Sequence, residues 1–123
     1  MSEHQEAKAL MKWRDHMIGK MPELAALYAV PNGGNRDIVA ASKLKAEGTM
    51  PGVADYHLPV ARGKYHSLYV ELKTETGRQS KAQKDFEALV TSHGNAYVVA
   101  HGWGKAGAAL LQYLSHGTVG ERI

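Results

Sequence analysis

Two carboxylates and a lysine in the middle of the chain have the residue types and the spacing of a site for a divalent cation. Asp55 follows a turn that begins at Gly52, and Glu71 and Lys73 come later, in an apolar run. In a β-strand, residues two apart point to the same face, so Glu71 and Lys73 project together while Leu72 points into the core. A lone Glu-x-Lys on a strand is usually a solvated surface pair, so the position of Asp55 decides between the two interpretations.

Asp55 is expected to lie opposite Glu71. The runs 56–61 and 67–73 are rich in Tyr, Val and Leu and are separated by a polar segment, which predicts a β-hairpin with its turn near residue 63. In an antiparallel pair with that turn, Asp55 faces Glu71. Charged groups that converge on an apolar sheet are costly unless they are paired or bound to an ion.

The predicted ion is Mg²⁺, for which Mn²⁺ would substitute. Carboxylate and carbonyl oxygens suit Mg²⁺, so the expected ligands are Asp55, Glu71 and the backbone carbonyl of Leu72, with water and phosphate completing the shell. Such an ion polarises a phosphate and activates water, and Lys73 would orient that water or neutralise developing charge. These residues therefore predict phosphodiester hydrolysis.

The flanking segments predict the elements that position this site. Apolar residues recur at helical spacing in 3–18, after the N-cap candidate Ser2, and in 37–47, before Gly48. Ser80 and Gln83 form a capping box that begins a third helix ending near Gly94, and a fourth helix is expected over 104–116. A short, continuously apolar strand, as expected of a strand covered on both faces, is predicted over 96–100, and 24–30 is an apolar stretch leading into a surface loop.

The fold class is therefore α/β. A hairpin followed by a helix and a return strand implies a mixed sheet, because the crossover makes the last strand parallel to the one before it. The chain has 123 residues and shows neither repeats nor a linker, so one domain over 1–123 is expected.

Composition favours a polyanionic partner and excludes several kinds of site. There are 15 Lys and Arg against 12 Asp and Glu, giving a formal charge of +3. Cysteine is absent, which excludes disulfides and thiolate zinc sites. The seven His are scattered and lack the H-E-x-x-H spacing, so zinc catalysis is the weaker alternative. No long apolar run or signal segment is seen, so we expect no membrane association and a cytoplasmic location.

Basic and glycine-rich residues are the candidate contacts to a nucleic-acid backbone. The turn over 32–36 has backbone N–H groups that can cradle a phosphate. Salt-sensitive contacts to phosphates, independent of sequence, are predicted for a set of polar and basic side chains, any one of which may instead only aid solubility. The set comprises Asn32, Arg36, Lys43, Lys45, Arg62, Lys64, Arg78, Lys81 and Lys84.

Five blocks of sequence, in order, resemble the VRR-NUC family, a branch of the PD-(D/E)xK nucleases. They are Pro31-Asn32-Gly33-Gly34, Leu44-Lys45-Ala46-Glu47-Gly48, Gly52-Val53-Ala54-Asp55, Leu68-Tyr69-Val70-Glu71-Leu72-Lys73 and Ser80-Lys81-Ala82-Gln83-Lys84. They look like the blocks of the small, stand-alone, phage-type members and span most of the chain. One departure is Ala54, where the family usually has proline before the aspartate.

The resemblance implies a restriction-endonuclease-like core in which Asp55 and Glu71 hold metal, Lys73 assists the nucleophile and Gln83 lines the site. It also implies an acidic residue from the first helix. Glu3 is the candidate, although Ala7 stands where the family often has Gln, and Glu6 is the competitor. Either could equally be a first-turn acid favoured by the helix dipole.

The resemblance also implies a DNA substrate. Stand-alone members look like Holliday-junction resolvases that act as dimers, so branched DNA and a homodimer are expected. The alternatives are a non-catalytic DNA-binding module and a nuclease or nickase without branch selectivity.

Overall fold

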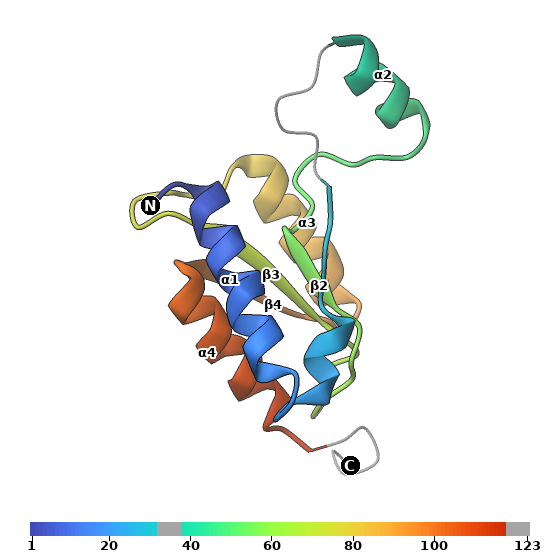
Figure 1. The fold of residues 1–123 in the computed structure, drawn as a ribbon. Coiled ribbons are helices and arrows are strands. Elements are labelled where there is room, and N and C mark those ends of the chain that lie inside the picture. The colour runs from blue at the N-terminus through green and yellow to red at the C-terminus, as the bar shows by residue number, and fades with distance from the viewer. Residues whose placement is uncertain (32–37, 118–123) are drawn as a thin grey trace.

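One mixed sheet lies at the centre of the structure, a computed structural model that describes residues 1–31 and 38–117 (Figure 1). The strands follow one another in the sheet in chain order: β1 (Tyr28–Ala29), β2 (Tyr56–Leu58), β3 (Leu68–Lys73) and β4 (Ala96–His101). β2 pairs antiparallel with β1 and with β3, whereas β4 runs parallel to β3. The predicted hairpin and parallel crossover are confirmed, and β3 is an inner strand with a partner on each side.

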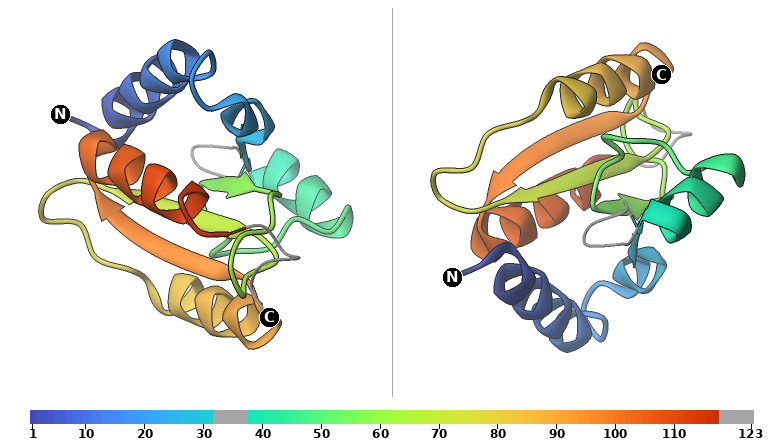
Figure 2. Two further views of the ribbon diagram at one scale, coloured as in Figure 1. Left: turned by 90° about the horizontal axis from the view of Figure 1, so that it is seen from below. Right: turned by 90° about the horizontal axis from the view of Figure 1, so that it is seen from above.

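Helices cover both faces of the sheet. α1 (Glu3–Met17) and α4 (Trp103–Leu114) lie on one face, and α3 (Lys81–Ser92) lies on the other (Figure 2). An apolar core lies between the sheet and the helices α1 and α4. It includes Leu10, Val70 and Leu110, all fully buried. On the opposite face, the ring of Phe86 in α3 packs edge-on against Tyr69 and Tyr97. Alternate residues of β3 therefore point to two different environments.

Two helices begin as the sequence predicts. Ser2 caps α1 in a capping box with Gln5, and Ser80 caps α3 in the same way with Gln83. In each box the serine hydroxyl accepts the backbone N–H three residues on, and the glutamine side chain accepts the N–H of the serine. These contacts satisfy N–H groups that a helix start leaves free.

Two expectations about the sheet are corrected, and one segment gains an assignment. The apolar stretch 24–30, which was given no element, contains the end of a 3₁₀ helix, η1 (Pro22–Ala26), and the strand β1. The first hairpin strand is shorter than 56–61, ending at Leu58. β4 was expected to be covered on both faces, yet Ala100 is its only buried residue, because this strand forms an edge of the sheet.

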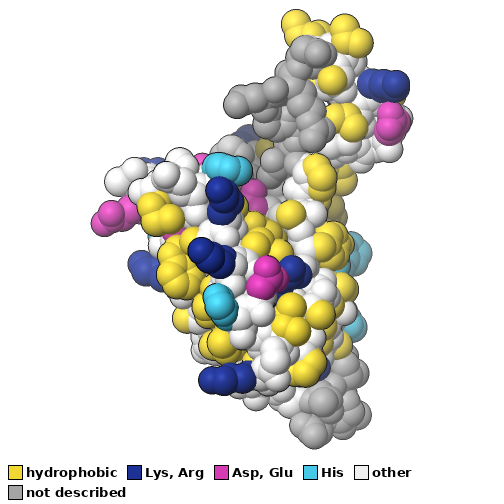
Figure 3. All heavy atoms as spheres, in the orientation of Figure 1, with side chains coloured by type: hydrophobic (Ala, Val, Ile, Leu, Met, Phe, Trp, Pro, Cys, Tyr) yellow, Lys and Arg dark blue, Asp and Glu magenta, His cyan; other side chains and the backbone are white. Residues whose placement is uncertain are grey.

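The helix α2 (Ile38–Ala46) projects from the rest of the structure (Figures 1 and 3). None of its residues is buried, and Ile38 and Val39 are 85% and 78% exposed. Gly48 follows it with a φ of +104°, as expected of a C-terminal cap. The sequence therefore predicts this helix correctly but not its detachment. No helix within the described ranges is long and apolar enough to cross a membrane.

Gly52 fixes the approach of the turn before Asp55 to the first turn of α3. Its φ is +81°, and a Cβ there would lie 2.3 Å from the carbonyl oxygen of Ala82. We predict that Gly52→Ala lowers the free energy of unfolding by about 2–4 kcal/mol, because it adds a backbone clash to a left-handed conformation. Urea denaturation measures this. Gly104→Ala is the matched control, because a Cβ there meets nothing within 4 Å; an equal loss in both variants would contradict the prediction.

Candidate active site

The inner strand β3 carries Glu71 and Lys73 to one end of the sheet. Both side chains are buried, with Glu71 0% and Lys73 8% exposed. They point to the face covered by α3, while Leu72 between them joins the apolar core. The pair is therefore not the solvated surface ion pair that a lone Glu-x-Lys usually forms.

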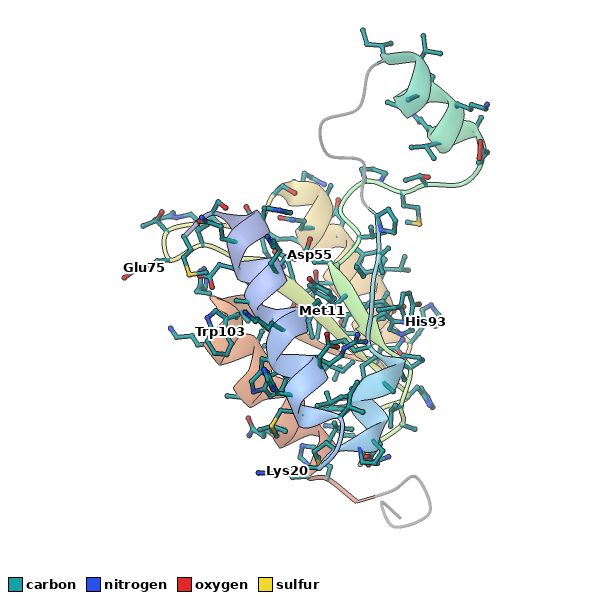
Figure 4. All side chains as sticks on the ribbon, in the orientation of Figure 1. Met11, Lys20, Asp55, Glu75, His93 and Trp103 are labelled. Carbon is teal, nitrogen blue, oxygen red and sulfur yellow. The ribbon has the colours of Figure 1, made fainter. Side chains whose placement is uncertain are left out.

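Asp55 lies where the hairpin register predicts. β2 and β3 pair Tyr56 with Val70 and Leu58 with Leu68, so the next pair in the series is Asp55 and Glu71. The carboxylate of Asp55 accepts the backbone N–H of Leu72 at 2.7 Å, and its own carbonyl accepts the N–H of Val30 at 2.8 Å. Asp55 is thus fixed to the strands on both sides of it, at the end of the sheet nearest α2 (Figure 4).

The two oxygens of Glu71 have different surroundings. Oε1 accepts hydrogen bonds from the Tyr97 hydroxyl at 2.5 Å and from Gln79 Nε2 at 3.2 Å. Oε2 is buried and has no hydrogen-bond donor in residues 1–31 and 38–117, and the Nζ of Lys73 lies 3.6 Å from it. A buried carboxylate oxygen is costly without a strong partner, so Oε2 is suited to a cation.

Tyr97 remains a hydrogen-bond donor over the whole useful pH range. Burial, followed by the hydrogen bond to Glu71 and the charge of that carboxylate, raises the pKa of the Tyr97 hydroxyl far above its usual range. Glu71 Oε1 therefore always faces a neutral O–H group.

Gln83 holds the amine of Lys73. Its Oε1 accepts Lys73 Nζ at 2.9 Å and also accepts the backbone N–H of Ser80 at 2.8 Å. The capping box that starts α3 thus also orients a site residue. Gln83 therefore lies in contact with Lys73, beside Glu71.

The carbonyl of Leu72 points to the Asp55 side of β3. The carbonyls of Ser67 and Lys73 accept N–H groups from the β4 side, from Ala96 and Gly102. Because carbonyls alternate along a strand, that of Leu72 points the other way, as does its N–H, which bonds to Asp55. This direction agrees with its predicted role as a ligand.

The two acidic candidates in α1 have different surroundings. Glu3 lines a pocket of about 240 Å³ together with Asp55 and Leu72. Glu6 instead accepts the backbone N–H of Trp103 at 3.1 Å, at the start of α4. Its carboxylate therefore caps a helix, and of the two acids only Glu3 lines the pocket that contains Asp55.

The oxygen donors of this region fit a hard cation. Two carboxylates and a backbone carbonyl suit Mg²⁺, which keeps several waters and takes few protein ligands. Among the described residues, no group of three or more His, Asp or Glu side chains is arranged to hold a metal. Water and a substrate oxygen would have to complete the shell.

The predicted phosphate contacts do not form one surface. Arg78 and Lys84 line a pocket of about 560 Å³ that shares Gln79 with the site. Lys81 is exposed at the start of α3 and pairs with Asp85 at 2.8 Å, and Lys43 and Lys45 are exposed on α2. Asn32 and Arg36 lie outside the described residues.

Arg62 and Lys64 lie away from the other predicted phosphate contacts that the structure describes. They lie in the connection between β2 and β3, at the end of the sheet opposite the site. Arg62 pairs with Glu23 at 2.5 Å and is mostly buried, and Lys64 lies over the ring of Tyr65. The predicted turn near residue 63 already places both residues at this end of the hairpin, whereas the ion pair between Arg62 and Glu23 cannot be read from the sequence.

Sequence reasoning missed Tyr97 and Gln79. Tyr97 pairs with Tyr69 in the parallel register, which places it on the face of Glu71. That register would have indicated it, but a parallel register cannot be read from the chain. Gln79 lies in the loop between β3 and α3, where periodicity gives no signal.

Comparison with known proteins adds an independent line of evidence. No protein-family model matches the chain, and no curated protein matches it. A solved structure described as "VRR_NUC domain protein" matches with a TM-score of 0.80 and 25% sequence identity, covering 96% of this chain and 92% of that one. The chain is therefore similar in fold to a VRR-NUC domain protein. The predicted mixed α/β fold is confirmed, and it is the fold of that VRR-NUC domain protein.

The different surroundings of Glu3 and Glu6 predict different effects when each is replaced. We expect Glu6→Ala to lower the free energy of unfolding by about 1 kcal/mol, because it removes the acceptor at the start of α4. Glu3→Ala is the matched control from the same helical turn and should change it by much less. Thermal or urea unfolding measures both, and a larger loss for Glu3→Ala would contradict the assignment.

Proposed function

We propose that this protein is a divalent-metal-dependent endonuclease that hydrolyses phosphodiester bonds in DNA. The observation that carries the proposal is the buried Oε2 of Glu71, with no hydrogen bond from the described residues, beside Lys73 and in register with Asp55. A buried carboxylate beside an amine adds little to stability, because replacing such a pair by apolar side chains is often neutral or stabilising, so the arrangement favours a function.

Asp55, Glu71 and the carbonyl of Leu72 would hold the cation, Mg²⁺ or Mn²⁺ in its place, and Glu3 lines a pocket with two of these residues, Asp55 and Leu72. The chemistry supplied by such a cation is Lewis-acid polarisation of the phosphate and activation of water. The ammonium of Lys73, oriented by Gln83, would stabilise negative charge that develops on the phosphate. Its burial strengthens this effect, because little water screens the charge.

The DNA backbone would approach along Arg78 and Lys84. Both line the pocket next to Gln79, which itself contacts Glu71. We propose branched DNA, of the Holliday-junction kind, as the preferred substrate and a homodimer as the active form. Symmetric cuts on a four-way junction need two active sites related by a two-fold axis.

Cleavage assays test the proposed activity. With Mg²⁺, we expect the protein to cut labelled four-way junctions faster than flaps or linear duplex. Asp55→Asn should lower the rate by roughly 100-fold or more, because it removes a ligand charge while keeping an acceptor for the N–H of Leu72.

DNA binding by the same variant, measured by fluorescence anisotropy, separates catalysis from recognition. Retained binding with lost cleavage supports the enzyme. If the wild type binds DNA but cuts none of the three substrates with Mg²⁺ or Mn²⁺, the chain is a binding module. Equal cutting of all three would instead indicate a nuclease without branch selectivity.

Basic residues at the two ends of the sheet should contribute unequally to DNA affinity. We predict that Arg78→Ala with Lys84→Ala weakens binding by about tenfold at moderate salt and lowers the salt dependence of log K by about 2, one for each lost phosphate contact. Lys64→Ala is the control, since Lys64 lies at the far end of the sheet. A larger loss in Lys64→Ala would show that DNA crosses the opposite end.

A further inference from the structure

We propose that Tyr97 and Gln79 are positioning residues that hold Oε1 of Glu71 and so present Oε2 to the cation. The inference deepens the proposed function and rests on it. Neither residue would touch the DNA or the metal in this role; each would act through Glu71.

Both donors converge on the same oxygen. Tyr97 reaches it from β4 at 2.5 Å, and Gln79 reaches it from the loop before α3 at 3.2 Å. The terminal torsion of a glutamate side chain is broad and roughly two-fold, so an unrestrained carboxylate can exchange its two oxygens. Two donors on one oxygen select a single orientation and leave the other oxygen beside Lys73.

Each donor is itself held in place. The ring of Tyr97 lies against Phe86 and Tyr69, with centroids 6.4 Å from each. The amide nitrogen of Gln79 also donates to Glu87 Oε1 at 2.8 Å, which links the loop to α3. The hydrogen bonds to Glu71 are therefore preorganised, as is usual for the partners of a metal-binding carboxylate.

The neutrality of both donors is the feature that favours a role in metal binding. An arginine or a lysine on Oε1 would stabilise Glu71 more strongly, but it would also neutralise the charge that attracts the cation. A hydroxyl and an amide fix the geometry and leave that charge available. Among the described residues, Lys73 forms the one ion pair with the Glu71 carboxylate, with its Nζ 3.6 Å from Oε2 and no hydrogen bond between them.

Tyr97→Phe tests the inference through metal binding as well as activity. We expect Mn²⁺ affinity, measured by isothermal titration calorimetry, to fall roughly 10- to 100-fold, as is typical when an outer partner of a metal ligand is removed. The Mg²⁺ concentration for half-maximal cleavage should rise by a similar factor, and excess metal should restore most of the maximal rate. A purely structural defect would not be rescued by metal.

Tyr69→Phe is the matched control. Tyr69 belongs to the same aromatic cluster, and none of its described contacts is a hydrogen bond to Glu71. We expect its Mn²⁺ affinity to match that of the wild type. Gln79→Ala provides a second test if Tyr97→Phe unfolds, and it should weaken Mn²⁺ binding in the same direction.

The outcomes separate this inference from the proposed function. If the wild type binds no Mn²⁺, the proposed function fails, and the positioning role fails with it. If the wild type binds Mn²⁺ and the folded Tyr97→Phe and Gln79→Ala variants bind it equally well, the positioning role alone is overturned. Weaker binding in both variants, with Tyr69→Phe unchanged, supports it.

Discussion

A fully buried carboxylate on an inner strand is the constraint on which the site depends. Glu71 has neighbouring strands on both sides and a helix over its face, so water cannot solvate its charge. The surroundings compensate with two neutral donors on one oxygen and an ammonium near the other. These three groups come from β4, from a loop and from β3 itself, so the charge is compatible with the fold only when the elements are assembled.

The same elements serve stability and the site at once. The capping box of Ser80 and Gln83 begins α3 and also supplies the acceptor for Lys73. Asp55 directly precedes β2, and its carboxylate accepts the N–H of Leu72 in β3. Each of these contacts stabilises the fold and also positions a charged side chain. Folding itself therefore places Asp55 and Lys73.

Local rules account for the parts of the fold and site that the sequence predicts. Alternation in a strand places Glu71 and Lys73 on one face, and the position of the hairpin turn sets Asp55 in register with Glu71. Capping chemistry identifies the starts at Ser2 and Ser80. Each of these inferences needs only residues close in sequence or joined by one short turn.

What the sequence could not provide depends on contacts between distant segments. β1 has only two residues and exists because β2 offers a partner, and none of the residues of α2 is buried against the described part of the chain. The contact between Tyr97 and Glu71 requires the parallel register across α3. Helical periodicity does not distinguish Glu3 from Glu6. Their different surroundings depend on the position of α4, whose first N–H bonds to Glu6. The ion pair between Arg62 and Glu23 likewise joins two segments that are far apart in the sequence.

The hydrogen bond between Asp55 and the amide of Leu72 has a consequence for dynamics. The amides of an inner strand are normally protected from exchange by hydrogen bonds to the backbone of a neighbouring strand. The amide of Leu72 is instead bonded to the side chain of Asp55, which directly precedes β2. Its exchange with solvent deuterium therefore depends on opening of the segment around Asp55 and not on separation of the two strands. The amide resonance of Leu72 in an NMR spectrum would thus report whether Asp55 is in place beside Glu71.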